Sequence, residues 1–464
     1  MTGQPEGRGH GDGPPETEAL ELSRSQRRRA QAQRTGEGAP QEGVEIFRSV
    51  DQAVLVALHR TGTTTHDVDA SLDELELLVD TAGGEVVGRV VQKRDVPDVA
   101  TFVGRGKVAE LKSLASQLGA DAAIFDDELS PAQQRNLEER LGIKVLDRNI
   151  VILDIFAQHA SSREGRAQVE LAQLSYLLPR LRGWGKALSQ QAGGIGGARR
   201  GPGETQLELD RRKLNRRITK LKADLRDFER TRRVKTQERE RAAVPTIALV
   251  GYTNAGKSTL MNALTGADVL VADQLFATLD TTARRLELPD GRQAVLTDTV
   301  GFVRKLPTQL VEAFKSTLED TLRADLLLHV VDGSAPNAGQ QIDAVREVLH
   351  EIGAHDVPEL LVVNKVDAAT PDAVDDLLAA HQGSVAVSAA TGAEVDKLRD
   401  VLSSRLRALS RIIELAVPYA RGDVMAALHR EGEVLVEIHG DRETRVRARI
   451  PQEDVSRFAD FVVG

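Results

Sequence analysis

Eight residues near the middle of this chain have the types and the spacing of a phosphate-binding loop. Two glycines stand five positions apart, and Lys257 and Ser258 follow the second one directly. An apolar run, 246–250, precedes the segment, and residues 260–264 have the pattern of a helix start. Backbone N–H groups in such a strand–loop–helix turn converge on an anion, so we expect a polyphosphate to bind here. The loop comprises Gly251, Tyr252, Thr253, Asn254, Ala255, Gly256, Lys257 and Ser258.

Two side chains in this loop, and one beyond it, carry chemistry of their own. Lys257 should reach the β- and γ-phosphates, and the Ser258 hydroxyl should ligate Mg²⁺. A threonine in a following switch segment would complete the metal site and sense the γ-phosphate. We choose Thr278, although Thr281 and Thr282 compete for this role on sequence alone. The predicted nucleotide contacts in this segment are Phe276, Ala277, Thr278, Leu279 and Asp280.

A third short motif follows the apolar run 294–297, which we expect to be a strand. The Asp298 carboxylate should hold the Mg²⁺ shell, and the Gly301 N–H should contact the γ-phosphate. The predicted contacts here are Asp298, Thr299, Val300 and Gly301, and the predicted catalytic set is Lys257, Thr278 and Gly301. Many GTPases place a water-orienting Gln after this glycine, but here it is Phe302. We therefore expect slow intrinsic hydrolysis, with another residue or a partner supplying the missing function.

Base identity should be read at the ends of two later strands. Residues 360–363 form one apolar run and 384–387 another. The Asp367 carboxylate can accept hydrogen bonds from guanine N1–H and the 2-amino group, which adenine does not offer in that geometry. The sequence therefore predicts GTP, with Mg²⁺, as the ligand. The predicted contacts are Asn364, Lys365, Val366, Asp367, Ser388, Ala389 and Ala390.

The elements around these motifs alternate between strand and helix patterns, which predicts an α/β multidomain fold with mainly parallel sheets. In the first part of the chain, Ser71–Glu74 has the capping-box pattern of a helix start. Asp126 follows an expected strand, where it could meet a ligand or simply form an acidic turn. The predicted domains are a disordered extension, 1–43; an α/β domain, 44–165; a basic helical hairpin, 166–243; a P-loop GTP-binding domain, 244–409; and a small α+β domain, 410–464.

The predicted hairpin rests on two narrow apolar stripes of the coiled-coil kind. Between them lies a loop, 183–205, that contains eight glycines together with Trp184, Arg199 and Arg200, which could contact nucleic acid. The first stripe is Leu171, Leu174, Leu178 and Leu181, and the second is Leu207, Leu214, Ile218, Leu221, Leu225 and Phe228.

Charge is unevenly distributed along the chain. Residues 180–243 contain 19 Lys or Arg and 8 Asp or Glu, a net of +11, so the remainder carries −9 − 11 = −20. A basic hairpin on an acidic protein predicts a polyanionic partner, whereas a merely solvated helix would carry balanced charge. The chain lacks cysteine and has no apolar run of membrane-spanning length, so we expect a cytoplasmic protein.

These motifs, joined to the Gly-rich segment Gly193–Gln206, resemble the HflX family of ribosome-associated GTPases. The resemblance covers about Val44 to the C-terminus. It implies a protein that binds the 50S ribosomal subunit and its rRNA through the hairpin, and that couples GTP to ribosome splitting, rescue or recycling. It also implies that Ser258 and Thr278 are the Mg²⁺ ligands.

Two other readings stay open on the sequence. The hairpin could be a protein-binding coiled coil on a GTPase switch, or the chain could act on another structured RNA with its first sheet as a second active site. We expect no DNA partner and a monomer away from the ribosome. The role of residues 1–43 and a second nucleotide in the first domain are not specified by these patterns.

Overall fold

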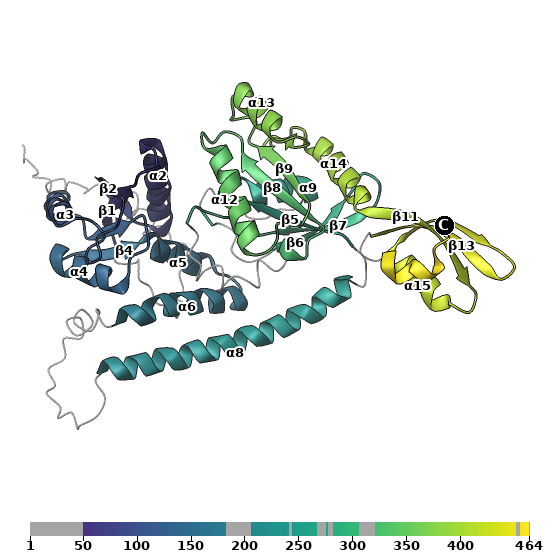
Figure 1. Ribbon diagram of the computed structural model, residues 1–464, viewed down its shortest axis with the longest axis horizontal. Helices are drawn as coiled ribbons and strands as arrows, with labels where there is room; N and C mark the ends of the chain where they lie inside the picture. The colour runs from purple at the N-terminus through teal and green to yellow at the C-terminus, as the bar shows by residue number, and fades with distance from the viewer. Residues whose placement is uncertain are drawn as a thin grey trace, which may run out of the picture. The chain divides into compact units, whose positions relative to one another are not determined.

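The computed structural model describes residues 50–181, 206–240, 244–266, 275–276, 282–305, 321–451 and 455–463. Across these ranges the strands form three sheets, and each sheet lies within one predicted domain (Figure 1). The predicted extension and the Gly-rich loop, with Trp184, Arg199 and Arg200, lie outside the described residues. In the part that is described, no helix is both long and apolar enough to cross a membrane.

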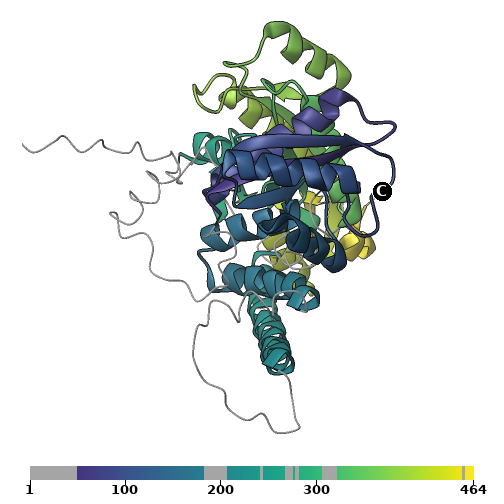
Figure 2. The ribbon, with the colours of Figure 1, turned by 90° about the vertical axis from the view of Figure 1, so that its left-hand side faces the viewer.

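The first sheet is parallel throughout, as the alternating pattern predicted. Its order is β2-β1-β3-β4, and every neighbouring pair is parallel. Successive residues of a strand point to opposite faces, so two layers of helices cover it. In Figure 2 the blue helices of this domain lie across its purple strands. The strands are β1 (Gln52–His59), β2 (Glu85–Lys93), β3 (Ala122–Phe125) and β4 (Lys144–Asp147).

Four helices cover this sheet, two on each face. One face packs α2 (Thr65–Ala82) and α5 (Arg148–His159), and the other packs α3 (Arg105–Leu118) and α4 (Pro131–Leu141). The predicted start of the first of these helices at Ser71 is wrong. The residue that caps α2 lies seven positions earlier, at Thr64, where the side chains of Thr64 and Asp67 form the capping box with each other's backbone N–H groups.

The predicted hairpin is present as two antiparallel helices, α6 (Arg163–Leu177) and α8 (Gln206–Glu240), which lie side by side (Figure 1). The first stripe ends earlier than predicted, because the chain turns into a short 3₁₀ segment, Leu178–Arg180, at Pro179, which has no N–H to continue the helix. The side chains between the two helices are Ala167, Leu171, Leu174, Leu214, Ile218, Leu221 and Leu225.

The second sheet, of the predicted GTP-binding domain, has the order β10-β9-β8-β5-β7-β6 and is parallel except for its edge strand β6. Helices cover both faces, with α12 on one and α9 and α14 on the other. The strands are β5 (Thr246–Gly251), β6 (Thr282–Glu287), β7 (Gln293–Asp298), β8 (Leu326–Asp332), β9 (Glu359–Asn364) and β10 (Val385–Ala386), and the helices are α9 (Lys257–Thr265), α12 (Ala338–Glu351), α13 (Pro371–Ala380) and α14 (Val395–Ala408).

The third sheet is antiparallel, in agreement with the predicted α+β domain. Strand β13 (Glu443–Pro451) pairs with β11 (Ser410–Pro418) and β12 (Glu433–His439). Helix α15 (Gly422–Glu431) packs on one face of the sheet, around the buried Leu428.

Candidate nucleotide-binding site

The predicted phosphate loop connects β5 to α9, at the carboxyl end of a central strand. Both of its glycines are required by close approaches. Gly251 has a φ of 149°, and a Cβ there would lie 2.2 Å from the Val330 carbonyl oxygen. Gly256 has a φ of 90°, and a Cβ there would lie 2.3 Å from Asn364 Nδ2. No side chain fits at either position, so the loop backbone lies close against the ends of the neighbouring strands, as a phosphate-binding loop requires.

Lys257 is folded back over this loop. Its Nζ donates to the carbonyl oxygens of Gly251 at 3.0 Å and Tyr252 at 2.9 Å, and the residue is only 7% exposed. Burial lowers the pKa of the ammonium to about 8, even though the Asp298 carboxylate acts in the opposite direction. A desolvated ammonium in this position favours a neighbouring anion.

The residues predicted to hold Mg²⁺ fit that ion as far as they are described. Ser258 Oγ donates to Asp298 Oδ2 at 2.7 Å, and Asp298 is fully buried at the end of β7. A hydroxyl and a carboxylate are oxygen ligands of the kind that Mg²⁺ takes alongside waters and substrate phosphates. Thr278, with Ala277, Leu279 and Asp280, lies outside the described residues. Within the described ranges, His, Cys, Asp and Glu form no cluster able to hold a metal on their own.

Gly301 lies directly against the phosphate loop. A Cβ on it would be 2.8 Å from Thr253 Cγ2 and 3.1 Å from Lys257 Nζ. Backbone hydrogen bonds reinforce the contact, from Thr253 N to the Phe302 carbonyl at 2.8 Å and from Phe302 N to the Gly251 carbonyl at 3.1 Å. The geometry thus brings the predicted catalytic Gly301 and Lys257 to one place.

Phe302, the residue in place of the water-orienting Gln, is 2% exposed and belongs to the apolar core. Its ring therefore packs with apolar side chains. The hydroxyl of Thr253 is buried and has no hydrogen-bond partner among the described residues. The slow intrinsic hydrolysis expected from the sequence remains a prediction.

The two segments that we predict to read the base are joined by side-chain hydrogen bonds. Asn364 Nδ2 donates to the Ala255 carbonyl at 2.9 Å, and its Oδ1 accepts from Ala389 N at 3.0 Å. Ser388 Oγ donates to Asp367 Oδ1 at 2.6 Å. Asn364 therefore braces both the phosphate loop and the last loop of the site, and Ser388 orients the carboxylate that we predict to read guanine.

Asp332 contacts the predicted site but was not among the residues predicted from the sequence. It ends β8, and its Oδ2 lies 2.7 Å from Lys365 Nζ. The available signal was its place directly after the apolar run of a predicted strand. Lys365, Asn254 and Phe276 all have φ near +60°, a conformation that costs free energy for residues other than glycine and clusters at functional sites.

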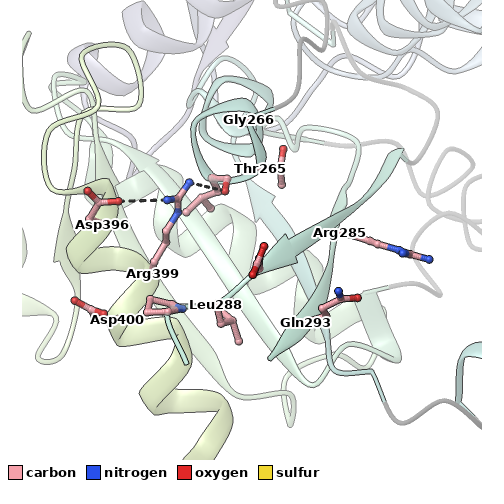
Figure 3. Close-up of a pocket in the computed structure, with 11 residues that line it drawn as sticks. Thr265, Gly266, Arg285, Leu288, Gln293, Asp396, Arg399 and Asp400 are labelled. Carbon is pink, nitrogen blue, oxygen red and sulfur yellow. Dashed lines mark hydrogen bonds and ion pairs between the residues drawn. The ribbon is translucent and has the colours of Figure 1, made fainter. Parts of the chain in front are cut away.

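A hollow in this domain lies at the end of α9 that is far from the phosphate loop (Figure 3). Two of its charged side chains, Arg399 and Asp396, make contacts within the fold. Arg399 of α14 donates to the Leu264 carbonyl at 2.8 Å and pairs with Asp396 at 3.3 Å. The Arg399 guanidinium therefore caps the last carbonyls of α9.

Comparisons with family models agree with this arrangement. Residues 69–157 match a model described as GTP-binding GTPase N-terminal, 159–239 one described as GTP-binding GTPase Middle Region, and 246–365 one described as 50S ribosome-binding GTPase. Together with the phosphate loop, these matches define the chain as a P-loop GTPase, an enzyme that hydrolyses GTP.

Similarity to curated proteins identifies the family. The chain is 47% identical over 420 residues to a protein named GTPase HflX from Lacrimispora saccharolytica, covering 90% of this chain and 98% of the relative. It is 44% identical over 413 residues to the Escherichia coli protein of that name, covering 88% and 95%. The chain belongs to the HflX family of GTPases.

A solved structure is also similar in sequence. A GTP-binding protein from Sulfolobus solfataricus in complex with GDP is 26% identical and covers 76% of this chain and 98% of its own length. The TM-score is 0.39, too low for the overall superposition to support an inference.

Proposed function

We propose that this GTPase binds the large ribosomal subunit and couples GTP binding and hydrolysis to ribosome splitting, rescue or recycling. The observation that carries the proposal is the basic helix α8. Helix α6 packs only against the apolar side chains of α8 around Leu221, which is 3% exposed. Arg211, Arg216 and Lys220 are exposed on the same helix. An exposed basic helix on a chain of net charge −9 favours an RNA partner.

The proposed site follows the sequence motifs. Lys257 and Gly301 contact the γ-phosphate, Ser258 and Thr278 ligate Mg²⁺, and Asp367 reads guanine. The contacts of Ser258 with Asp298 and of Ser388 with Asp367 support these assignments. Because Phe302 supplies no polar group, hydrolysis is slow in the free monomer and is stimulated by the ribosome. The protein works in the cytoplasm.

Co-sedimentation with purified large subunits tests the proposal. The full chain should sediment with the subunits in a non-hydrolysable GTP analogue and much less in GDP or without nucleotide. A variant with Arg211→Glu, Arg216→Glu and Lys220→Glu should lose this association while its GTP affinity stays unchanged. The matched control reverses three exposed basic residues of the first domain, Lys112, Arg135 and Arg140, and should sediment like the unaltered protein.

Retention of the α8 variant on the subunits would reject the hairpin as the RNA-binding element. If the unaltered chain fails to sediment in any nucleotide state, the alternative of a protein partner or another structured RNA takes the place of the ribosome.

A further inference from the structure

Tyr252 connects the phosphate loop to the residues that follow Gly301. Its hydroxyl accepts a hydrogen bond from the Arg304 backbone N–H at 2.7 Å and donates one to Glu74 Oε1 at 2.7 Å. Tyr252 is 7% exposed, so these contacts are shielded from water. One side chain of the phosphate loop therefore touches both the segment after Gly301 and helix α2 of the first sheet.

Glu74 is in turn held by a chain of charged side chains, of which Arg148 and Asp126 are buried and Lys305 is exposed. Arg148 Nη1 lies 3.3 Å from Glu74 Oε2, and Arg148 Nη2 lies 2.6 Å from Asp126 Oδ1. Asp126 Oδ2 also accepts from Lys305 Nζ at 2.7 Å. Lys305 directly follows Arg304, whose backbone N–H binds the Tyr252 hydroxyl. The contacts therefore form a closed ring that starts and ends at this hydroxyl.

The protonation states of Tyr252 and Asp126 in this ring are fixed by their surroundings. Burial, and then the Glu74 carboxylate, raises the pKa of the Tyr252 phenol well above its usual value, so it remains a donor. Burial would raise the pKa of Asp126, but Arg148 and Lys305 hold it below its usual range. Breaking such a buried pair by removing one partner is costly, because the other charge stays buried.

We propose that the Tyr252 hydroxyl is a positioning group for GTP hydrolysis, held in place by Glu74 from the first domain. Backbone hydrogen bonds join the phosphate loop to the segment after Gly301 at Phe302. The Tyr252 hydroxyl adds the next contact, at Arg304, and so fixes the geometry of residues 301–304. Displacement of a reacting group by about 1 Å can slow a reaction about 100-fold. The inference rests on the proposed γ-phosphate contact of Gly301 and not on ribosome binding.

The variant Tyr252→Phe tests this role, because it removes only the hydroxyl. In the full chain, single-turnover hydrolysis should be about tenfold slower, as expected for one lost hydrogen bond that acts on the transition state. The affinities for GTP and GDP should change by less than about threefold, because the phosphates meet the loop backbone and not the phenol ring. Quenched-flow hydrolysis and titration with fluorescent nucleotides measure the two quantities separately.

Three further variants decide between positioning and a general structural effect. Tyr419→Phe is the matched control, since this hydroxyl donates to the Gly440 carbonyl at 2.6 Å in the third sheet, and its hydrolysis rate should be unchanged. Glu74→Ala should slow hydrolysis as Tyr252→Phe does. The double variant should be no slower than the slower single variant, because the ring is already broken.

An unchanged or faster rate in Tyr252→Phe, with normal GDP affinity, would overturn the inference, and so would fully additive slowing in the double variant. Ribosome binding is tested apart from this. The unaltered chain could fail to sediment with large subunits while Tyr252→Phe hydrolyses GTP more slowly than the unaltered chain. That result would reject the ribosome proposal alone.

Discussion

At the scale of single residues, the phosphate loop depends on two glycines that have close neighbours and on one buried lysine. Gly251 and Gly256 have no room for a Cβ, and Lys257 lies folded over the loop with its ammonium largely desolvated. Burial has lowered the pKa of this ammonium to about 8. A bound polyphosphate would favour the charged form and raise that pKa again. Nucleotide binding and protonation of Lys257 are therefore coupled.

This coupling predicts how GTP affinity depends on pH. Below pH 8 Lys257 is already protonated, so the affinity should be nearly constant. Above pH 8 the free protein must take up a proton in order to bind, and the affinity should fall by up to about tenfold per pH unit. Titration with a fluorescent GTP analogue between pH 7 and 9 measures the slope.

Lys257→Arg is the control for this prediction, since a guanidinium stays charged over the whole range. The slope above pH 8 should disappear in that variant. An equally steep slope in Lys257→Arg would assign the proton to another group, for example the guanine base.

At the scale of elements, α8 packs against α6 over only part of its length. The buried side chains between them form a single narrow stripe, and the ion pair of Arg217 with Glu170 closes it on one side at 2.6 Å. A helix that buries so narrow a stripe is held by few contacts, so each of them contributes a large share of the local stability.

Leu221→Ala should therefore loosen the hairpin. Leu221 is 3% exposed, and its truncation should cost about 2 kcal/mol, at the low end for buried leucines. Hydrogen exchange of the α6 amides should become about 30-fold faster, since about 1.4 kcal/mol corresponds to a factor of ten. Leu209→Ala on the same helix is the matched control. It is 40% exposed and should change exchange by no more than about threefold. Equal effects of the two variants would contradict this account of the hairpin.

At the scale of the whole molecule, charge is divided between a basic hairpin and an acidic remainder. The net charge of residues 180–243 is +11, against −20 for the other residues. Repulsion between an acidic body and an RNA surface would restrict binding to the hairpin and fix its orientation. This division predicts that the binding affinity for an RNA partner falls steeply with added salt, whereas the affinity for a protein partner falls only slightly.

The salt dependence can be assigned to α8. In a plot of log affinity for large subunits against log salt concentration, each phosphate contact contributes about −0.7 to −0.9 to the slope. Replacing Arg211, Arg216 and Lys220 with Gln should make the slope shallower by about two units, whereas the same change at Lys112, Arg135 and Arg140 should leave it unaltered. Co-sedimentation between about 50 and 200 mM salt gives both slopes. Identical slopes for the two variants would argue against α8 as the RNA contact.

By itself, the sequence determined the features whose physics is local. Alternating strand and helix patterns were enough to predict the parallel first sheet, and the spacing from Gly251 to Ser258 was enough to predict the phosphate loop, because its backbone geometry depends on consecutive residues. The segment from Asn364 to Asp367, which we predict to read guanine, also consists of consecutive residues.

Only the tertiary structure decided between local signals of equal strength. Ser71 with Glu74 and Thr64 with Asp67 both satisfy the capping-box pattern, but only the second pair caps α2. Ser71 instead donates to Asp126 at 2.8 Å, and Glu74 accepts from Tyr252, which lies 178 residues away in the chain. Periodicity and spacing contain no information on contacts at such separations. These contacts depend on how the helices pack on the first sheet and on how that sheet's helices meet the phosphate loop.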